Sequence, residues 1–133
     1  MHSATASALR ASLYVLALTP LSIPASAVTQ CGEASWYDHA GRPTASGGTV
    51  DPETLTAAHR TLAFGSRVHV ENLDNGKTVT VRIDDRGPFT DGRIIDVSRA
   101  AAEELAFKGD GVTQVRITTI ETKLKTASTK DCR

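Results

Sequence analysis

The sequence predicts a small, mainly β domain, either a barrel or a sandwich, with one short α-helix. Several short segments alternate apolar and polar residues, which is the pattern of half-buried strands. Turn residues separate these segments, and a single alanine-rich segment has the composition of a helix. The chain has 133 residues, a length that favours one domain.

The first half of the domain is expected to hold two strands and a long loop. Residues 32–38 (GEASWYD) alternate and carry two aromatic side chains, so they predict the first strand. Residues 39–53 are rich in Gly, Pro, Ser and Thr and predict a loop, which at that length is more often functional than idle. Residues 55–60 (LTAAHR) predict a short strand or a turn.

A hairpin is expected next. Residues 66–73 and 77–84 both alternate, and the second segment places Val79, Val81 and Ile83 on one face. The residues between them, 74–76 (DNG), suit a type I′ turn.

The last predicted elements are a strand, a helix and a strand. Residues 93–97 (RIIDV) form another short apolar strand. Residues 98–109 predict the helix, with Ser98 as its N-cap, Ala101 and Leu105 facing the core, and Gly109 at its end. The closing strand is 112–121, with its inward side chains expected to be Val115, Ile117 and Ile120.

The net charge and the N-terminal sequence limit the classes of protein to which the chain can belong. Fifteen basic residues balance fifteen acidic ones, so nothing favours nucleic acid or an anionic membrane surface. Residues 1–27 read as a signal peptide: Arg10 is basic, 11–24 are apolar, and 25–27 (ASA) form a cleavage site. A membrane anchor is the alternative, but the apolar run is short and contains two prolines. The mature domain is then 28–122, followed by a polar tail, 123–133.

The two cysteines bracket this domain. Cys31 and Cys132 are the cysteines of the whole chain, and in an oxidising compartment the pair predicts one disulfide that ties the tail back. Such a bond is worth ~4 kcal/mol in the chain-entropy model. Two unpaired thiols are the alternative, and a metal site is disfavoured because no histidine pair lies nearby.

Three acidic or imidazole side chains are candidates for chemistry. Asp84 and Asp85 end a predicted strand before Gly87-Pro88, so only one of them can line a given pocket, and Arg86 is placed to hold a carboxylate ionised. A turn in which both aspartates bind backbone amides is the alternative. His59 can exchange protons with a carboxylate or be a buried structural residue.

Two further aspartates are first given structural roles. Asp51, before Pro52, is typical of a turn. Asp96 is expected to cap the helix region or to bond backbone near Ser98.

Several motifs together resemble the rare lipoprotein A (RlpA) family of bacterial cell-envelope proteins. They are ASWYD, GRPTASGG, LTAAHRTLAFGSRVHVENLDNGKTVTVRIDDRGPF and GRIIDVSRAAAEEL, and they span about residues 32–121. The resemblance implies a six-stranded double-psi β-barrel in the periplasm or cell envelope, acting as a monomer without cofactor or metal. It also implies peptidoglycan glycan strands as substrate and possible septal-ring partners.

The activity that the resemblance implies is lytic transglycosylation, in which a MurNAc–GlcNAc bond is cleaved without water and a 1,6-anhydro product is left. Its catalytic residues would be Asp85, His59 and Asp51. The matched motifs imply the substrate-binding residues Trp36, Tyr37, Thr44, Ser46 and Arg86. Active members have TASGE where this chain has TASGG, so Gly48 replaces a glutamate. Two hypotheses follow: a lytic transglycosylase that relies on Asp85, or an expansin-like barrel that binds glycan without cutting it.

Overall fold

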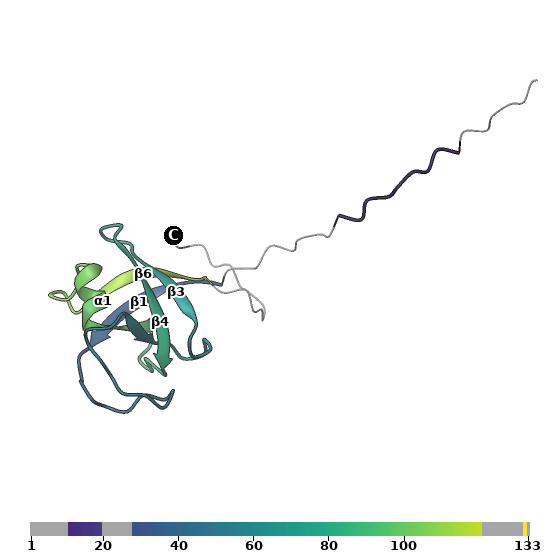
Figure 1. Cartoon of the computed structure of the whole chain (residues 1–133). Helices are drawn as coiled ribbons and strands as arrows, with labels where there is room; N and C mark the ends of the chain where they lie inside the picture. Colours follow the sequence, from purple (N-terminus) through teal and green to yellow (C-terminus); the bar gives the residue numbers. More distant parts are fainter. Residues whose placement is uncertain (1–10, 20–27, 121–131, 133) are drawn as a thin grey trace, which may run out of the picture.

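Six strands close into a barrel, which excludes the sandwich (Figure 1). The computed structural model describes residues 11–19, 28–120 and 132. The strand order around the barrel is β1-β5-β2-β4-β3-β6, and one helix, α1, follows β5. The elements are β1 (Thr29–Tyr37), β2 (Thr56–Ala58), β3 (Arg67–Asn72), β4 (Thr78–Asp85), β5 (Arg93–Ser98), α1 (Arg99–Glu104) and β6 (Val112–Thr119).

The pairing is mixed. β1 runs parallel to β5, and β2 runs parallel to β4. The pairs β1–β6, β2–β5, β3–β4 and β3–β6 are antiparallel. This is the six-stranded double-psi β-barrel that the family resemblance implied, with one short helix. The loop 38–55 crosses from the end of β1 to β2 below the barrel in Figure 1.

Alternation placed the core correctly in most strands. Val79, Val81 and Ile83 are all buried, as are Val115 and Ile117 of β6. Ile120 is 54% exposed, so the expectation that it packs inward is wrong. The reason is that Thr113, Val115 and Ile117 are the inward residues of β6, so that alternation turns Ile120, just after the strand, to the outer side.

The helix begins where the sequence predicted and ends earlier. Ser98 is the N-cap, and its hydroxyl accepts a hydrogen bond from the Ala101 amide at 3.3 Å. The expected end at Gly109 is wrong, because α1 stops at Glu104 and Ala106 takes a left-handed φ of 57°. That reversal places the Phe107 side chain in the core, 1% exposed, with Leu105 beside it in the same cluster.

The β3–β4 hairpin is present, but its turn is not type I′. A type I′ turn needs positive φ at both central residues. Gly76 has a φ of 74°, whereas Ala106 is the one non-glycine residue with positive φ in the described part of the chain. Asn75 is held differently: its side-chain amide donates to the Leu105 carbonyl and its Oδ1 accepts from the Lys77 amide. The loop therefore spans four residues between Asn72 and Lys77, whose backbones bond at 2.8 Å.

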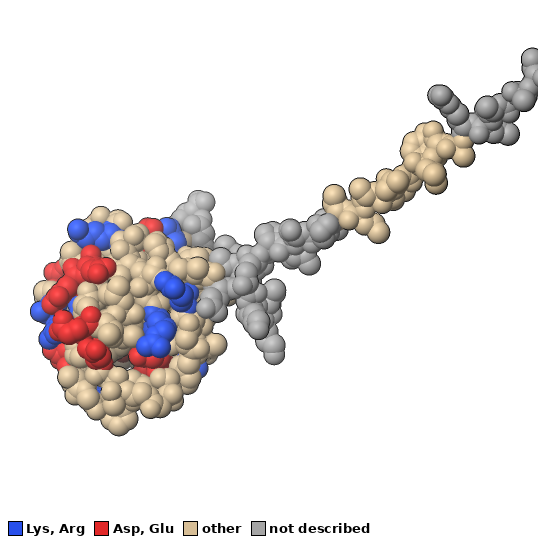
Figure 2. Space-filling view, in the orientation of Figure 1, with Lys and Arg blue, Asp and Glu red and all other residues tan. Residues whose placement is uncertain are grey.

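The predicted disulfide between Cys31 and Cys132 is confirmed, with Cα atoms 5.8 Å apart. Apart from Cys132, the tail prediction concerns residues outside the described ranges, and so does most of the signal-peptide prediction. Across the ranges that are described, no helix is both long and apolar enough to cross a membrane. On the face shown in Figure 2, acidic and basic side chains are interspersed around the barrel.

Candidate active site

A groove of about 490 Å³ lies on the outside of the barrel. Strand residues form most of its wall, and His39 and Arg42 join it from the loop 38–55. Among its lining residues, two are acidic, Asp85 and Asp96.

The floor of this groove is one cross-strand row. Ala58 of β2 pairs with Asp85 of β4 on one side and with Asp96 of β5 on the other. Asp96 pairs in turn with Ser35 of β1, and Ser35 with Val112 of β6. All five residues line the groove. Directly paired residues project to the same face of a sheet, so the row presents these side chains together.

A β-bulge brings Asp85 into the row. Simple alternation from Val81 and Ile83 would turn Asp85 toward the core. The register instead shifts, because Ala57 pairs with Ile83 while the next residue, Ala58, pairs with Asp85. Asp84 is the extra residue, and bulges of this kind re-aim a side chain. Asp85 therefore lines the groove, and Asp84 is absent from its lining.

The carboxylate of Asp85 is held by backbone amides at one oxygen and faces an exposed guanidinium at the other. Oδ1 accepts hydrogen bonds from the Ala45 and Arg86 amides, both at 2.9 Å. Oδ2 lies 3.6 Å from the guanidinium of Arg42, whose side chain is 55% exposed. Two backbone donors thus fix the orientation of the group, while Oδ2 is available to a ligand that displaces Arg42.

The guanidinium of Arg86 does not pair with the Asp85 carboxylate, contrary to what the sequence suggested. Its Nη1 donates to the carbonyls of His59, at 3.2 Å, and Leu62, at 2.8 Å. Its guanidinium also lies 3.9 Å from the centre of the Phe64 ring, a cation–π contact. Arg86 lines the groove but ties the loop after β2 to the end of β4. Arg42, from the long loop, is the cation that faces Asp85.

His59 is buried beside the site with both ring nitrogens occupied. Nδ1 accepts from the Thr61 and Leu62 amides, each at 3.1 Å, which makes Nε2 the protonated nitrogen. Nε2 lies 2.7 Å from Gln30 Oε1 and donates to it. Burial, with smaller contributions from the charges of Arg60 and Arg86, lowers the pKa of His59 to about 4.

This neutral ring is 3% exposed and is absent from the groove lining. The geometry therefore favours the structural interpretation of His59 over proton exchange. Its backbone still supports the site, since the His59 amide donates to the Asp85 carbonyl at 3.1 Å.

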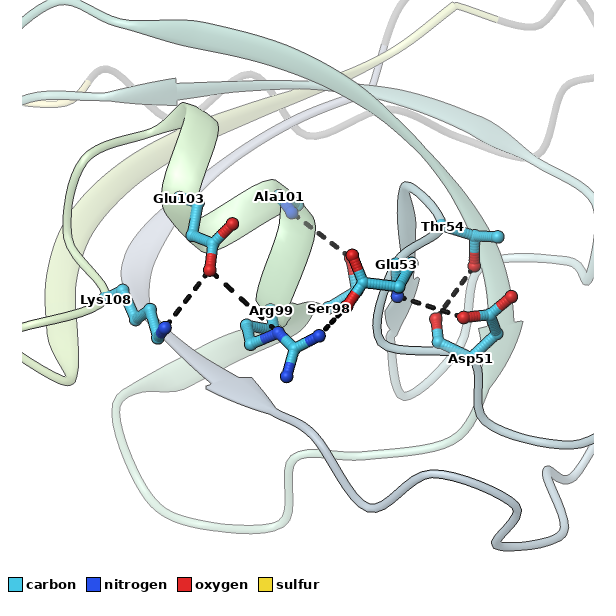
Figure 3. Close-up of polar contacts among 8 residues, drawn as sticks. All are labelled: Asp51, Glu53, Thr54, Ser98, Arg99, Ala101, Glu103 and Lys108. Carbon is cyan, nitrogen blue, oxygen red and sulfur yellow. Dashed lines mark hydrogen bonds and ion pairs between the residues drawn. The ribbon is translucent and has the colours of Figure 1, made fainter.

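Asp51 is absent from the groove lining, and Figure 3 shows its contacts with Glu53 and Thr54. Its Oδ1 accepts from the Glu53 amide at 3.0 Å, and its carbonyl accepts from the Thr54 hydroxyl at 2.9 Å, which is the turn that Asp51-Pro52 suggested. Glu53 forms an ion pair with Arg99 at the start of α1. Asp51 thus anchors the end of the long loop, and a catalytic role for it stays a prediction.

Thr44 and Ser46 shape the loop that holds Asp85. Their hydroxyls bond to each other at 2.9 Å, and Thr44 Oγ1 accepts from the Gly48 amide at 3.2 Å. Neither residue lines the groove, and a substrate contact for either stays a prediction. A Cβ at Gly48 would meet only Thr44 Oγ1, at 3.5 Å, and no positive φ restricts this position. The loop can therefore accept the glutamate of the family motif.

Trp36 and Tyr37 do line the groove. The Trp36 indole N–H donates to the Lys108 carbonyl at 3.2 Å, which fixes the ring at the wall. The Tyr37 hydroxyl bonds Thr56 Oγ1 at 3.0 Å. Burial is the main cause that raises the pKa of Tyr37 to about 12, opposed by the Thr56 hydrogen bond and supported by nearby Asp84, Asp85 and Asp96. Tyr37 is a neutral phenol at the wall of the groove.

Sequence reasoning missed Arg42 and assigned Asp96 incorrectly. The helix cap is Ser98, whereas Asp96 accepts a hydrogen bond from the Ser35 hydroxyl and lines the groove. The alternation of Ile95, Asp96 and Val97 contained the signal, since both apolar neighbours are fully buried and Asp96 must face outward. In the described ranges, no group of three or more His, Cys, Asp or Glu side chains could hold a metal ion.

Comparison with known proteins identifies relatives of this domain. A family model described as lytic transglycolase matches residues 29–117. A protein of Nostoc sp., named "Probable endolytic peptidoglycan transglycosylase RlpA", is 57% identical over 90 residues, covering 65% of this chain and 24% of that protein. Proteins named "Endolytic peptidoglycan transglycosylase RlpA" match from Neisseria meningitidis (52% over 91 residues; 67% of this chain, 38% of that protein) and Pseudomonas aeruginosa (48% over 99; 73% and 29%). The chain thus spans between 24% and 38% of the length of these relatives.

Solved structures share the fold. The Streptomyces papain inhibitor superposes with a TM-score of 0.59 at 24% identity, covering 70% of this chain and 94% of that one. An expansin of Clavibacter michiganensis gives a TM-score of 0.58 at 21% identity, covering 74% of this chain and 53% of that one. At these identities the likeness concerns the barrel alone.

Proposed function

The chain belongs to the lytic transglycolase family, and on that premise we propose that it is an endolytic peptidoglycan lytic transglycosylase. The observation that carries the proposal is Asp85 in the groove, oriented through Oδ1 by two backbone amides and paired at Oδ2 only with the exposed side chain of Arg42. The names of the relatives point to peptidoglycan as the substrate, and we assign the MurNAc–GlcNAc bond of its glycan strands as the bond that is cleaved.

The proposed reaction needs one carboxyl group that gives and then takes a proton. Asp85, in its acid form, donates the proton on Oδ2 to the glycosidic oxygen, so the C1–O4 bond breaks and GlcNAc leaves with a hydroxyl. The C6 hydroxyl of the muramic residue then bonds to C1 and returns its proton to Asp85. The 1,6-anhydro ring forms, no water enters, and the enzyme is regenerated.

The location and assembly state belong to the same proposal. A substrate in the cell wall requires export, and we assign residues 1–27 as the signal peptide. The described fold supports that boundary, because Val28 already pairs with Thr119 through its amide and its carbonyl. We assign the mature protein as a monomer of the periplasm or cell envelope, with septal-ring proteins as candidate partners.

The test is digestion of peptidoglycan sacculi from which stem peptides have been removed. The mature protein should release anhydromuramyl products, detected by mass spectrometry, and Asp85→Asn should lower the rate by about 10²–10⁴-fold, the usual worth of a general acid–base group. Asp91→Asn is the matched control, because Asp91 is exposed and lies outside the groove lining. Equal rates for the wild type and Asp85→Asn would assign the proton transfer to another group.

A second candidate function is favoured by Gly48, which lacks the carboxylate of the family motif. In this case the barrel binds glycan without cutting it, as an expansin-like protein. The same digestion separates the two functions: co-sedimentation with sacculi in the absence of any anhydro product would support binding alone.

A further inference from the structure

The floor row of the groove ends at the proposed acid. It crosses the barrel from Val112 of β6 to Asp85 of β4, so it is roughly 19 Å long at the usual strand spacing. β3 pairs with β4 between Thr78 and Arg82, so in the described part of the chain no strand extends the row past Asp85. A glycan that lies along the row therefore reaches the end of the floor at the bond that is cleaved.

Cleavage inside a glycan strand requires that sugar units are held on both sides of the cleaved bond. This requirement comes with the proposed function, since the relatives are named endolytic. The floor row supports the units on one side of Asp85. The aromatic side chains of the lining, Trp36 and Tyr37, are on that same side, because both belong to β1. The units on the other side need a surface beyond the end of the floor.

Two loops lie beyond that end. The loop 86–92 joins β4 to β5, and its first residue, Arg86, and the residue after it, Arg93, both line the groove. The loop 59–66 joins β2 to β3, and Arg86 holds it through two carbonyl hydrogen bonds and a ring contact. The groove therefore continues directly onto this pair of loops.

Each of the two loops exposes one phenylalanine. Phe89 is 80% exposed and Phe64 is 42% exposed, and we refer to the two side chains as the aromatic rim. The Phe64 ring lies 3.9 Å from the guanidinium of Arg86. The Phe89 ring lies over the next residue, Gly87, where an added Cβ would be 3.7 Å from the Phe89 Cε2 atom. The rim therefore contacts the two residues that directly follow Asp85.

Phe89 is presented by a loop that the barrel holds in place. Pro88, directly before it, is buried. The carbonyls of Thr90 and Gly92 accept hydrogen bonds from backbone amides at the start of β5, at 3.2 Å, and in β1, at 3.0 Å. A ring that is fixed before binding loses little conformational freedom when a ligand covers it.

We propose that the aromatic rim is a sugar-binding site that extends the groove past Asp85, an inference that rests on the proposed function. One face of a pyranose ring consists of C–H bonds, which pack on the face of an aromatic ring. An exposed phenyl ring offers such a face at a large apolar area. The occupant is the part of the glycan strand on the far side of the cleaved bond from the floor row. Phe89 supplies the larger open surface, and Phe64 borders it on the neighbouring loop.

The test compares a short and a long glycan in an Asp85→Asn background, in which cleavage does not consume the ligand. Calorimetry measures the binding of a peptide-free GlcNAc–MurNAc disaccharide, which the floor can hold, and of the octasaccharide, which reaches past it. Phe89→Ala should weaken octasaccharide binding by about two- to tenfold, the usual effect of one aromatic contact, and leave disaccharide binding unchanged. Phe89→Tyr keeps the ring and should retain the affinity. Leu73→Ala is the control, because Leu73 is also exposed but is absent from the groove lining.

Three results would overturn the inference. The first is an octasaccharide affinity that Phe89→Ala leaves unchanged, and the second is the absence of octasaccharide binding in the Asp85→Asn background. The third is an equal loss for both glycans, since the ring would then act within the groove and not beyond its end. Failure of the proposed function is seen separately in the digestion of sacculi, because a wild type that releases no anhydro product can still bind the octasaccharide through the rim.

Discussion

Acid should destabilise this barrel through protonation of His59. The pKa of His59 is about 4 in the folded protein against an ordinary value of 6.5. Because the folded value is depressed, the unfolded chain binds the proton first as the pH falls. The stability contributed by the neutral ring is complete above pH 6.5 and is lost progressively toward pH 4.

The size of the effect follows from the two pKa values. Between pH 7 and pH 5 the linkage relation gives a loss of about 2 kcal/mol in the free energy of unfolding. His59 is the histidine expected to dominate in this range, because its ring is buried and its pKa is lowered. Urea denaturation at a series of pH values measures the loss directly.

A pair of variants tests the reasoning. In His59→Asn the Oδ1 atom can replace Nδ1 as acceptor for the Thr61 and Leu62 amides, so the fold should survive and the pH dependence above pH 5 should flatten. His59→Ala leaves both amides and Gln30 without their partner and should cost about 2–5 kcal/mol at neutral pH. A slope for His59→Asn that equals the wild-type slope would refute the assignment.

Three further predictions concern Gly48 in the loop 38–55, the disulfide, and Arg86 at the end of β4. Gly48→Glu should fold normally, because only Thr44 Oγ1 lies near the new Cβ, and should raise the rate of anhydro product release; Gly48→Gln is the uncharged control, and equal rates for both would exclude a role for the charge. Reducing the bond between Cys31 and Cys132, 101 residues apart, should lower the free energy of unfolding by about 4 kcal/mol, and an unchanged melting temperature would contradict this. Arg86→Lys should lower the free energy of unfolding by about 1–3 kcal/mol, because lysine cannot both bind the two carbonyls and stack on the Phe64 ring. A variant as stable as the wild type in urea would show that these contacts of Arg86 are not needed for stability.

Much of the fold could be predicted from local sequence patterns. The alternation of Val79, Val81 and Ile83 identified a core face, and Ser98 marked the start of the helix. The ends of elements were predicted less well. Gly109 has the residue type of a helix end, but burial of Phe107 required the chain to reverse earlier, at Ala106.

The candidate site was predicted through its motif more than through its geometry. Asp85 lines the groove because the pairing register between β2 and β4 shifts by one residue at Asp84. No residue type in β4 indicates that shift. The family motifs also selected His59 and Asp51, but the His59 side chain binds Gln30 and the Asp51 side chain binds the Glu53 amide. Asp96 was visible in the alternation of β5, but its neighbours across the sheet depend on a strand order that sequence does not give.

The central claim is that Asp85 moves one proton between two sugar oxygens with no water taking part. It is tested most directly by digesting peptide-free sacculi in oxygen-18 water and measuring the masses of the released glycan fragments by mass spectrometry. We predict 1,6-anhydro products without the label, and their loss in Asp85→Asn. Reducing-end products that carry one labelled oxygen would show hydrolysis and contradict the account.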